Sequence, residues 1–249
     1  MPQVVRDLFE SYVKERFDLQ DCIAVNNGTS ALIATLWSMN LKPDDEVIDI
    51  DPDTLLIDPQ KIEQAITDKT KAIIPVHLYG RICDINTINE IARRYNIVVI
   101  EDTAQAFGAV TEDGRHAGMI ADAGTFSFYK TKNISTFEGG MICVPKESRL
   151  DHAVIRAICD QGQVGKYNHE YIGFNFRLAE PLCLMALEQM KLHMTGIKAE
   201  LGLRGPKQGH YPKVVYDQPV YKKLSIRGDC PVAEEKALEI RKHIQEVIK

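Results

Sequence analysis

Apolar and polar residues follow two different periods along the chain, which predicts alternating helices and strands. Between residues 4 and 17 apolar positions recur at the spacing of one helix face. Residues 22–25 instead form an unbroken apolar run, which is typical of a buried strand. The alternation continues downstream. Further helices are expected at residues 30–39, 58–66, 85–95 and 178–194, and further strands at 46–50, 71–76, 97–101, 124–128 and 140–144.

This order of elements predicts an α/β fold with a mostly parallel central sheet and helices on both faces. Strands that are apolar along their whole length need cover on both sides. After residue 195 the sequence becomes richer in Gly, Pro, Lys and Tyr before a charged closing helix. We therefore expect a large domain over residues 1–195 and a smaller, incomplete C-terminal α/β domain over 196–249.

The charge and composition argue against several classes of partner. The 30 Lys and Arg and 35 Asp and Glu give a net charge of −5, so we expect neither nucleic acid nor a membrane surface as a partner. No apolar run reaches the roughly 18 residues of a membrane span, and we see no signal peptide. The six cysteines lack C-x-x-C spacing, so we expect free buried thiols, no metal site and a cytoplasmic location.

Two residues near the ends of apolar runs carry the most specific chemistry. Asp102 ends the run NIVVIED, and Lys132 follows the run TFSF after a short loop. Ligands of open α/β sheets gather beyond the carboxyl ends of strands, where Asp102 falls. A lysine can hold pyridoxal phosphate (PLP) as a Schiff base, and an acid can keep the pyridine nitrogen protonated. The pair predicts a PLP enzyme with both as catalytic residues, ahead of the alternative that Asp102 only caps the next turn.

The segment NNGTS, residues 26–30, is a candidate phosphate site because it lies between a strand and a helix. The first amides of a helix lack internal partners and carry partial positive charge. Gly28 permits close approach of the backbone, and Thr29 and Ser30 add hydroxyl donors. Taken alone, a plain helix cap is the better interpretation. Ser127, at the end of the strand before Lys132, could donate to the same phosphate.

Three other residues leave two interpretations open. Gln105 reaches the same ligand as Asp102 if its segment turns helically. Lys130 is chemically a rival of Lys132, although we expect it to face solvent or to contact the phosphate. His77 either lines the site or is a structural histidine with its hydrogen bonds satisfied.

These segments resemble the DegT/DnrJ/EryC1/StrS family of sugar aminotransferases, which have the PLP fold type I architecture. The resemblance runs through almost the whole chain, and the motif around Lys132 is its most specific part. The matching segments are NNGTSAL (26–32), IDPDTLLIDPQKIEQAI (50–66), KAIIPVHLYG (71–80), VVIEDTAQAFGA through FSFYKTKNISTFEGGM (98–141), YIGFNFRLAEPLCLMALEQM (171–190), HYPKVVYDQPVY (210–221) and CPVAEEKALEI (230–240).

The resemblance implies which residues surround the cofactor ring. Lys132 would be the Schiff-base lysine and Asp102 the partner of the pyridine nitrogen. Gln105 would lie against the ring near its 3-oxygen. Relatives that act as sugar dehydratases have a histidine where this chain has Lys132, so the lysine favours transamination.

The resemblance also implies how the cofactor phosphate is held. Thr29 and Ser127, with the region of Gly28 and Ser30, would bind it within one subunit. Asn175, in GFNFR, would reach the phosphate of a neighbouring subunit. The family therefore implies a homodimer with shared active sites.

The sequence departs from the family at several places. Ile48 is followed directly by Asp49, without the segment that normally carries an aromatic residue stacked on the cofactor ring. Much of the small domain and a proline-rich C-terminal stretch are also missing. Either the protein is a trimmed, inactive relative, or the sequence consists of the ordered parts of a longer chain, which is the explanation we favour.

We therefore expect a PLP-dependent aminotransferase that converts a nucleotide-linked keto sugar to an amino sugar, with glutamate or glutamine as amino donor. Two alternatives stay open. One is transamination of a cyclitol ketone of the inosose type. The other is a non-catalytic protein of the PLP fold with a regulatory role.

Overall fold

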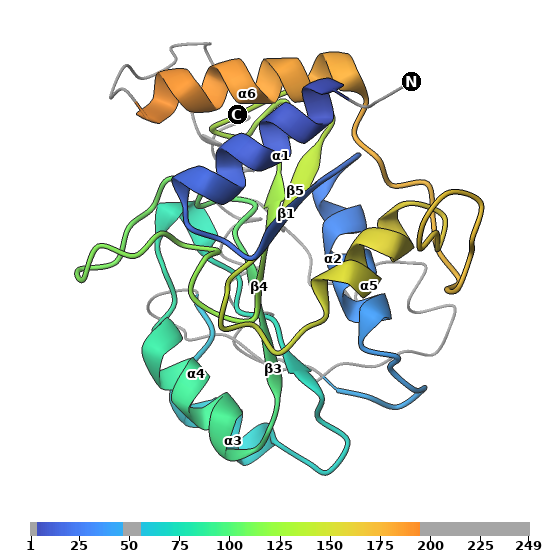
Figure 1. Ribbon diagram of the computed structural model, residues 1–249. Coiled ribbons are helices and arrows are strands. Elements are labelled where there is room, and N and C mark those ends of the chain that lie inside the picture. The colour runs from blue at the N-terminus through green and yellow to red at the C-terminus, as the bar shows by residue number, and fades with distance from the viewer. Residues whose placement is uncertain (1–3, 47–55, 195–249) are drawn as a thin grey trace, which may run out of the picture.

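A single sheet forms the centre of the computed structural model, which describes residues 4–46 and 56–194 (Figure 1). The expected small domain at 196–249 and nearly all of the strand expected at 46–50 lie outside these residues. Five strands of the described part pair in the order β1-β5-β4-β3-β2. Their bounds are β1 Asp21–Val25, β2 Ala72–Ile73, β3 Val98–Asp102, β4 Ala123–Ser127 and β5 Gly140–Val144.

The strand directions confirm a mostly parallel sheet in the described part. Strand β3 is parallel to both β2 and β4, whereas β5 is antiparallel to both β4 and β1. Four strands therefore share one direction, and only β5 opposes them. Because β3 and β4 run side by side in the same direction, their carboxyl ends meet at one edge of the sheet.

Helices cover both faces of the sheet, as expected. Their bounds are α1 Val4–Arg16, α2 Gly28–Ser38, α3 Pro59–Ala65, α4 Ile85–Arg94, α5 His152–Cys159 and α6 Glu180–Met194, with a short 3-10 turn, η1, at Leu78–Gly80. In Figure 1, α1 and α6 lie side by side across the top, and α2 and α5 lie together on another side.

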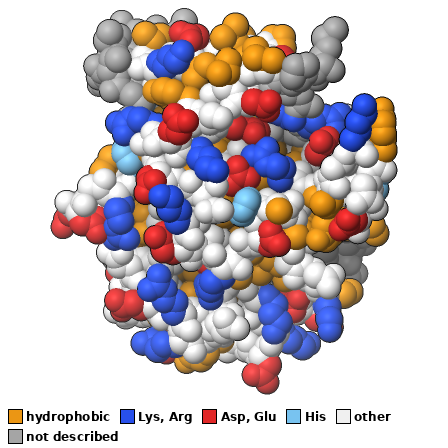
Figure 2. All heavy atoms as spheres, in the orientation of Figure 1, with side chains coloured by type: hydrophobic (Ala, Val, Ile, Leu, Met, Phe, Trp, Pro, Cys, Tyr) orange, Lys and Arg blue, Asp and Glu red, His pale blue; other side chains and the backbone are white. Residues whose placement is uncertain are grey.

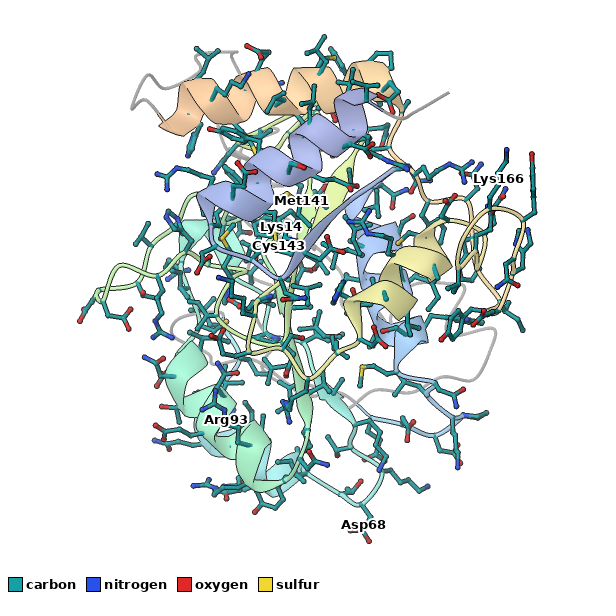
Figure 3. The ribbon with its side chains drawn as sticks, in the orientation of Figure 1. Lys14, Asp68, Arg93, Met141, Cys143 and Lys166 are labelled. Carbon is teal, nitrogen blue, oxygen red and sulfur yellow. The ribbon has the colours of Figure 1, made fainter. Side chains whose placement is uncertain are left out.

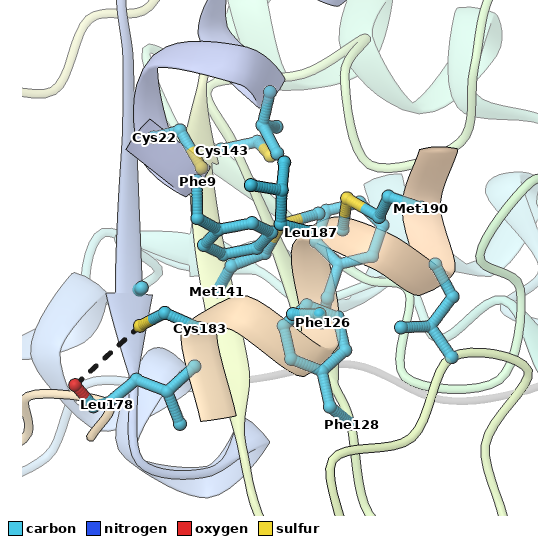
Figure 4. Packing of buried hydrophobic residues seen from close by; sticks show 14 of the residues in the cluster. Phe9, Cys22, Phe126, Phe128, Met141, Cys143, Leu178, Cys183, Leu187 and Met190 are labelled. Atoms are coloured by element: carbon cyan, nitrogen blue, oxygen red, sulfur yellow. Dashed lines mark hydrogen bonds between the residues drawn. The ribbon is translucent and has the colours of Figure 1, made fainter. Parts of the chain in front are cut away.

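Side chains of strand β1 alternate between these two helical layers. In β1, Cys22 and Ala24 join the core under α1 and α6, whereas Ile23 and Val25 join the core under α2 and α5. Figure 4 shows the first core, in which Phe9 packs beside side chains of the sheet and of α6. This alternation is the period-2 pattern of a strand that is buried on both sides.

Helix α5 was not predicted from the sequence. Asp151 caps it by accepting hydrogen bonds from the N–H groups of Ala153 and Val154. Ile155 and Ile158 then recur at helical spacing and are buried against the sheet. The run is only eight residues long, so its period is hard to distinguish from that of a short strand.

Strand β2 is shorter than the expected strand at 71–76 because Pro75 interrupts it. Proline has no N–H to donate to a neighbouring strand. The chain nevertheless continues beside β3, where Val76 forms an isolated parallel bridge with Asp102. This continuation places residues 75–77 beside the end of β3.

The surface carries both signs of charge. Figure 2 shows Lys and Arg interspersed with Asp and Glu over one face. Figure 3 shows Met141 and Cys143 near α1 and Arg93 on α4, whereas Asp68 and Lys166 extend from the edges of the molecule. Within residues 4–46 and 56–194, no helix is both long enough and apolar enough to cross a membrane.

Candidate active site

A cavity of about 660 Å³ lies where the ends of β3 and β4 meet the beginning of α2. Six of the eight residues predicted to bind cofactor or to act in catalysis line this cavity. They are Gly28, Thr29, Ser30, Asp102, Ser127 and Lys132. They come from three separate parts of the sequence, so only the fold brings them together.

Helix α2 presents unpaired backbone donors to the cavity. Asn27 caps the helix, accepting from the N–H of Ser30 at 2.7 Å through its side chain and from that of Ala31 at 3.2 Å through its carbonyl. The N–H groups of Gly28 and Thr29 have no partner among the described residues. Two backbone donors and the partial positive charge of a helix start therefore face the cavity.

Two glycines allow α2 to begin so close to the sheet. A Cβ atom on Gly28 would lie 2.9 Å from the Cβ of Ser127. A Cβ on Gly140, in β5, would lie 2.6 Å from the carbonyl oxygen of Phe126 and 2.7 Å from the backbone carbon of Asn27. Any larger residue at either position would push the helix start away from the end of β4.

Asp102 sits on the α2 side of the sheet at the last position of β3. Its Oδ1 accepts a hydrogen bond from the N–H of Ala104 at 3.0 Å, and its side chain has no other hydrogen bond in the described part of the chain. Burial raises the pKa of Asp102, while the Ala104 N–H and the positive charge of Lys132 pull it down. The carboxyl group thus keeps spare acceptor capacity toward the cavity.

Lys132 lines the same cavity from the loop after β4 and is half-buried. Its backbone N–H donates to the carbonyl of Tyr129 at 2.9 Å, which tightens the loop. Burial lowers the pKa of Lys132, and the negative charge of Asp102 opposes that shift. The lysine and the acid therefore interact electrostatically, without a direct hydrogen bond between them. A lowered pKa increases the fraction of neutral amine, the form that is nucleophilic.

Gln105 and Asn175 are the two predicted residues that the structure does not bring into the cavity wall. The side-chain oxygen of Gln105 instead accepts from the N–H of Tyr79 at 3.4 Å. Asn175 is exposed and forms an isolated bridge with Asp160. The contact of Gln105 with a cofactor ring and the role of Asn175 toward a second subunit both stay predictions.

Several cavity residues were not predicted as site residues. Asn27, Thr125, Tyr129 and Glu138 also line the cavity. Tyr129 and Glu138 flank Lys132 along the chain, so proximity in sequence could have indicated them. Thr125 shares a face with Ser127 two positions later, which the alternation of a strand implies.

His77 is resolved as a buried histidine with satisfied hydrogen bonds, not a cavity residue. It is fully buried, and its Nε2 lies 2.9 Å from a carboxylate oxygen of Glu101. Glu101 precedes Asp102 in β3 and is also fully buried, on the other side of the sheet. Glu101 was not predicted as a site residue. A charged residue inside a strand that is otherwise apolar was the available signal.

Comparison with known proteins places this arrangement in a family. The sequence matches the DegT/DnrJ/EryC1/StrS aminotransferase family over residues 5–48 and 47–199. This chain belongs to the DegT/DnrJ/EryC1/StrS family. The resemblance seen in the motifs around Asp102 and Lys132 is thereby confirmed for most of the sequence.

Relatives within the DegT/DnrJ/EryC1/StrS family include characterised enzymes. GDP-perosamine synthase of Caulobacter vibrioides is 38% identical over 208 residues, which cover 74% of this chain and 55% of that enzyme. The aminotransferase of Psychrobacter cryohalolentis superposes with a TM-score of 0.70 at 32% identity, covering 77% of this chain and 57% of that one. Spr1654 of Streptococcus pneumoniae in its PLP form has a TM-score of 0.69 at 25% identity, covering 77% and 60%.

The chain thus spans a little over half the length of the relatives it matches. The matched part contains the sheet and the whole cavity described above. Within residues 4–46 and 56–194, no group of three or more His, Cys, Asp or Glu side chains is arranged to hold a metal ion.

Proposed function

We propose that this chain is the cofactor-binding part of a PLP-dependent aminotransferase that acts on a nucleotide-linked keto sugar. The observation that carries the proposal is the cavity itself, which joins Lys132, Asp102 and the unpaired N–H groups at the start of α2. These are the three kinds of group that PLP needs: an amine, an acid and phosphate donors.

The residues of the cavity fit PLP in charge and in hydrogen-bonding capacity. The N–H groups of Gly28 and Thr29, with the hydroxyls of Ser30 and Ser127, would hold the phosphate. Asp102 would hold the pyridine nitrogen, since a buried carboxylate with spare acceptor capacity favours an N–H partner. Lys132 would hold the aldehyde carbon through its Nζ.

The chemistry divides between the cofactor and the protein. When bound, PLP supplies an electron-accepting ring. Lys132, whose pKa is lowered by burial, would take and return a proton at its Nζ during amino transfer. Asp102 would keep the proton on the ring nitrogen, and the walls of the cavity would limit access of water.

The choice of a nucleotide-linked sugar rests on the relatives. GDP-perosamine synthase is among the most similar proteins, and its name identifies a nucleotide sugar. Glutamate or glutamine is the proposed amino donor. We further propose a homodimer in which the exposed Asn175 reaches the partner's phosphate site. The five cysteines of the described residues are all free and buried, which fits the reducing cytoplasm.

Replacement of Lys132 by alanine tests the proposal. The wild-type protein with added PLP should show the absorbance band of a lysine-bound cofactor, and Lys132→Ala should lose both the band and amino transfer. Lys130→Ala is the matched control, because Lys130 is an exposed lysine two residues away on the same loop. Full turnover in Lys132→Ala would show that the assignment is wrong.

A substrate panel then separates the sugar function from its alternative. Consumption of glutamate or glutamine would be followed with nucleotide-linked 3-keto and 4-keto sugars and with an inosose-type ketone. Turnover of the cyclitol ketone alone would favour the cyclitol function. A protein that never forms the lysine-bound band would instead favour a regulatory role.

A further inference from the structure

Glu101 sits at the centre of a buried hydrogen-bond cluster that the proposed chemistry does not use. Its Oε1 accepts from the N–H groups of Ile120 and Ala121, both at 2.8 Å. Its Oε2 accepts from the N–H of Gly118 at 2.8 Å and lies 2.9 Å from Nε2 of His77. Four donors fill the acceptor positions of the carboxylate, so its buried charge is fully compensated.

The proton of His77 can be assigned from its partners. The backbone N–H of Cys83 donates to Nδ1 of His77 at 3.1 Å, and a backbone N–H can only donate. Nδ1 is therefore the acceptor of the ring, and Nε2 carries the proton that it donates to Glu101. The ring joins the segment after β2 to the carboxylate of β3.

The same segment also holds the backbone of Asp102. The N–H of His77 donates to the carbonyl of Asp102 at 3.0 Å, and the N–H of Asp102 donates to the carbonyl of Pro75 at 2.9 Å. On its other side, Asp102 pairs with Thr125 of β4. The end of β3 is thus clamped between β4 and residues 75–77.

These backbone contacts are important because the side chain of Asp102 has few contacts that could hold its carboxyl group in place. Its one hydrogen bond, to the Ala104 N–H, comes from the turn that directly follows it. The position of the carboxyl group therefore depends on the backbone at the end of β3. Since Pro75 cannot donate to the sheet, the His77 ring and two backbone hydrogen bonds are what tie residues 75–77 to β3.

We propose that His77 and Glu101 are positioning residues, which fix the backbone of Asp102 so that its carboxyl group meets the cofactor ring. This role rests on the proposed function, because it concerns the contact between Asp102 and PLP. Alternation in β3 sends Glu101 to one side of the sheet and Asp102 to the other, so the buried cluster acts from behind the site.

The test compares three variants of the full chain with PLP added. His77→Leu removes the donor to Glu101, and His77→Gln restores an N–H at the place of Nε2. Cys83→Ala is the matched control, because it removes a buried side chain beside the same cluster and keeps the backbone N–H that donates to His77. The readouts are the absorbance band of bound PLP, kcat, KM for the amino donor and the thermal midpoint.

In His77→Leu, the absorbance band of bound PLP should shift and kcat should fall about 10-fold to 100-fold. KM for the amino donor should change by less than about threefold, because displacement of the Asp102 carboxyl group weakens stabilisation of the transition state more than it weakens substrate binding. His77→Gln should recover most of the wild-type band and most of the wild-type kcat. Cys83→Ala should lower the thermal midpoint and leave the band and kcat unchanged. The proposal is overturned if His77→Leu behaves like Cys83→Ala.

Two results separate other outcomes. If His77→Leu does not fold, Glu101→Gln decides, because it keeps the shape but replaces one acceptor oxygen with a donor; a wild-type band and kcat in that variant overturn the proposal. If the wild-type protein itself forms no band, the proposed function fails together with this inference. A wild-type band with an unaffected His77→Leu overturns the positioning role alone.

Discussion

Two clusters of charged side chains in this protein are built in opposite ways. Arg156 donates to both carboxylate oxygens of Asp21, to Glu10 at 2.8 Å and to the carbonyl of Cys22 at 2.9 Å. Asp102 and Lys132 face each other with no hydrogen bond between them, and each has a pKa shifted against its charge by burial. In the first cluster nearly all hydrogen-bonding positions are used, whereas the second cluster has capacity left for a ligand.

The difference teaches how structural and functional charges can be distinguished. A charged group whose hydrogen-bonding positions are nearly all used joins elements together, as Arg156 joins α5 to β1 and α1 through four hydrogen bonds. A buried charge with unused capacity is costly to the free protein, which is typical of groups that await a partner. The Glu101 cluster belongs to the first kind, although it lies directly behind a residue of the second.

The largest expected effect, and the strongest test of this comparison, is the loss of turnover on replacement of Asp102. Asp102→Asn should reduce turnover by about 100-fold to 1,000-fold, because a preorganised charge is lost from the reaction site. Its stability should not fall below that of the wild type, since the amide oxygen can still accept from the N–H of Ala104. Steady-state kinetics and urea unfolding measure the two properties. Asp21→Asn is the control, with reduced stability and unchanged turnover per folded molecule. If Asp21→Asn lost turnover and Asp102→Asn lost only stability, the distinction between structural and functional charges would be contradicted.

The next effect concerns the cluster around Arg156. Arg156→Ala should lower the free energy of unfolding by about 2 kcal/mol, because Asp21 and Glu10 lose their nearest cationic partner at a site that is partly open to solvent. Urea unfolding measures the loss, and kcat should be normal below the transition. The free energy of unfolding of Arg156→Lys should lie between those of the wild type and Arg156→Ala, because lysine keeps the charge but not the paired contacts with Asp21. An unchanged stability would show that the cluster is not structural.

A smaller effect is expected where backbone shape, not charge, makes the site. Gly28→Ala should weaken PLP binding about tenfold, because a Cβ placed 2.9 Å from that of Ser127 moves the start of α2. Fluorescence titration with PLP measures the affinity. Ser38→Ala, at the other end of α2, should leave it unchanged. If Gly28→Ala bound PLP with the affinity of the wild type, the start of α2 would not contact the phosphate.

The smallest effect is the dependence of stability on pH in the absence of PLP. Burial raises the pKa of Asp102, so the native state keeps this proton to a higher pH than the unfolded chain does. The stability that the protonated group contributes is present below its usual pKa of 3.8 and is lost as the pH rises through the raised value. Relative to wild type, Asp102→Asn should therefore become more stable as the pH rises above 3.8. A difference in the free energy of unfolding that shrinks as the pH rises would contradict the direction.

Much of the fold follows from local patterns in the sequence. The strands around Cys22, Val99 and Met141 are mostly apolar, and the helices carry regular apolar faces, so elements of this kind could be predicted. Helix α5 was missed because eight residues contain too few turns to establish a period. Strand β2 was expected to be longer. Pro75 ends it only because the neighbouring strand β3 would need an N–H donor at that position.

The sequence by itself determined the chemistry that is available to the site, because Asp102, Lys132 and the NNGTS turn belong to motifs whose spacing is local. Only the tertiary structure decided that these residues share one cavity, that Gln105 turns toward Tyr79, and that His77 bonds to Glu101. Those outcomes depend on which strands become neighbours and on which side of the sheet each residue faces. Contacts between distant segments leave no periodic signal along the chain.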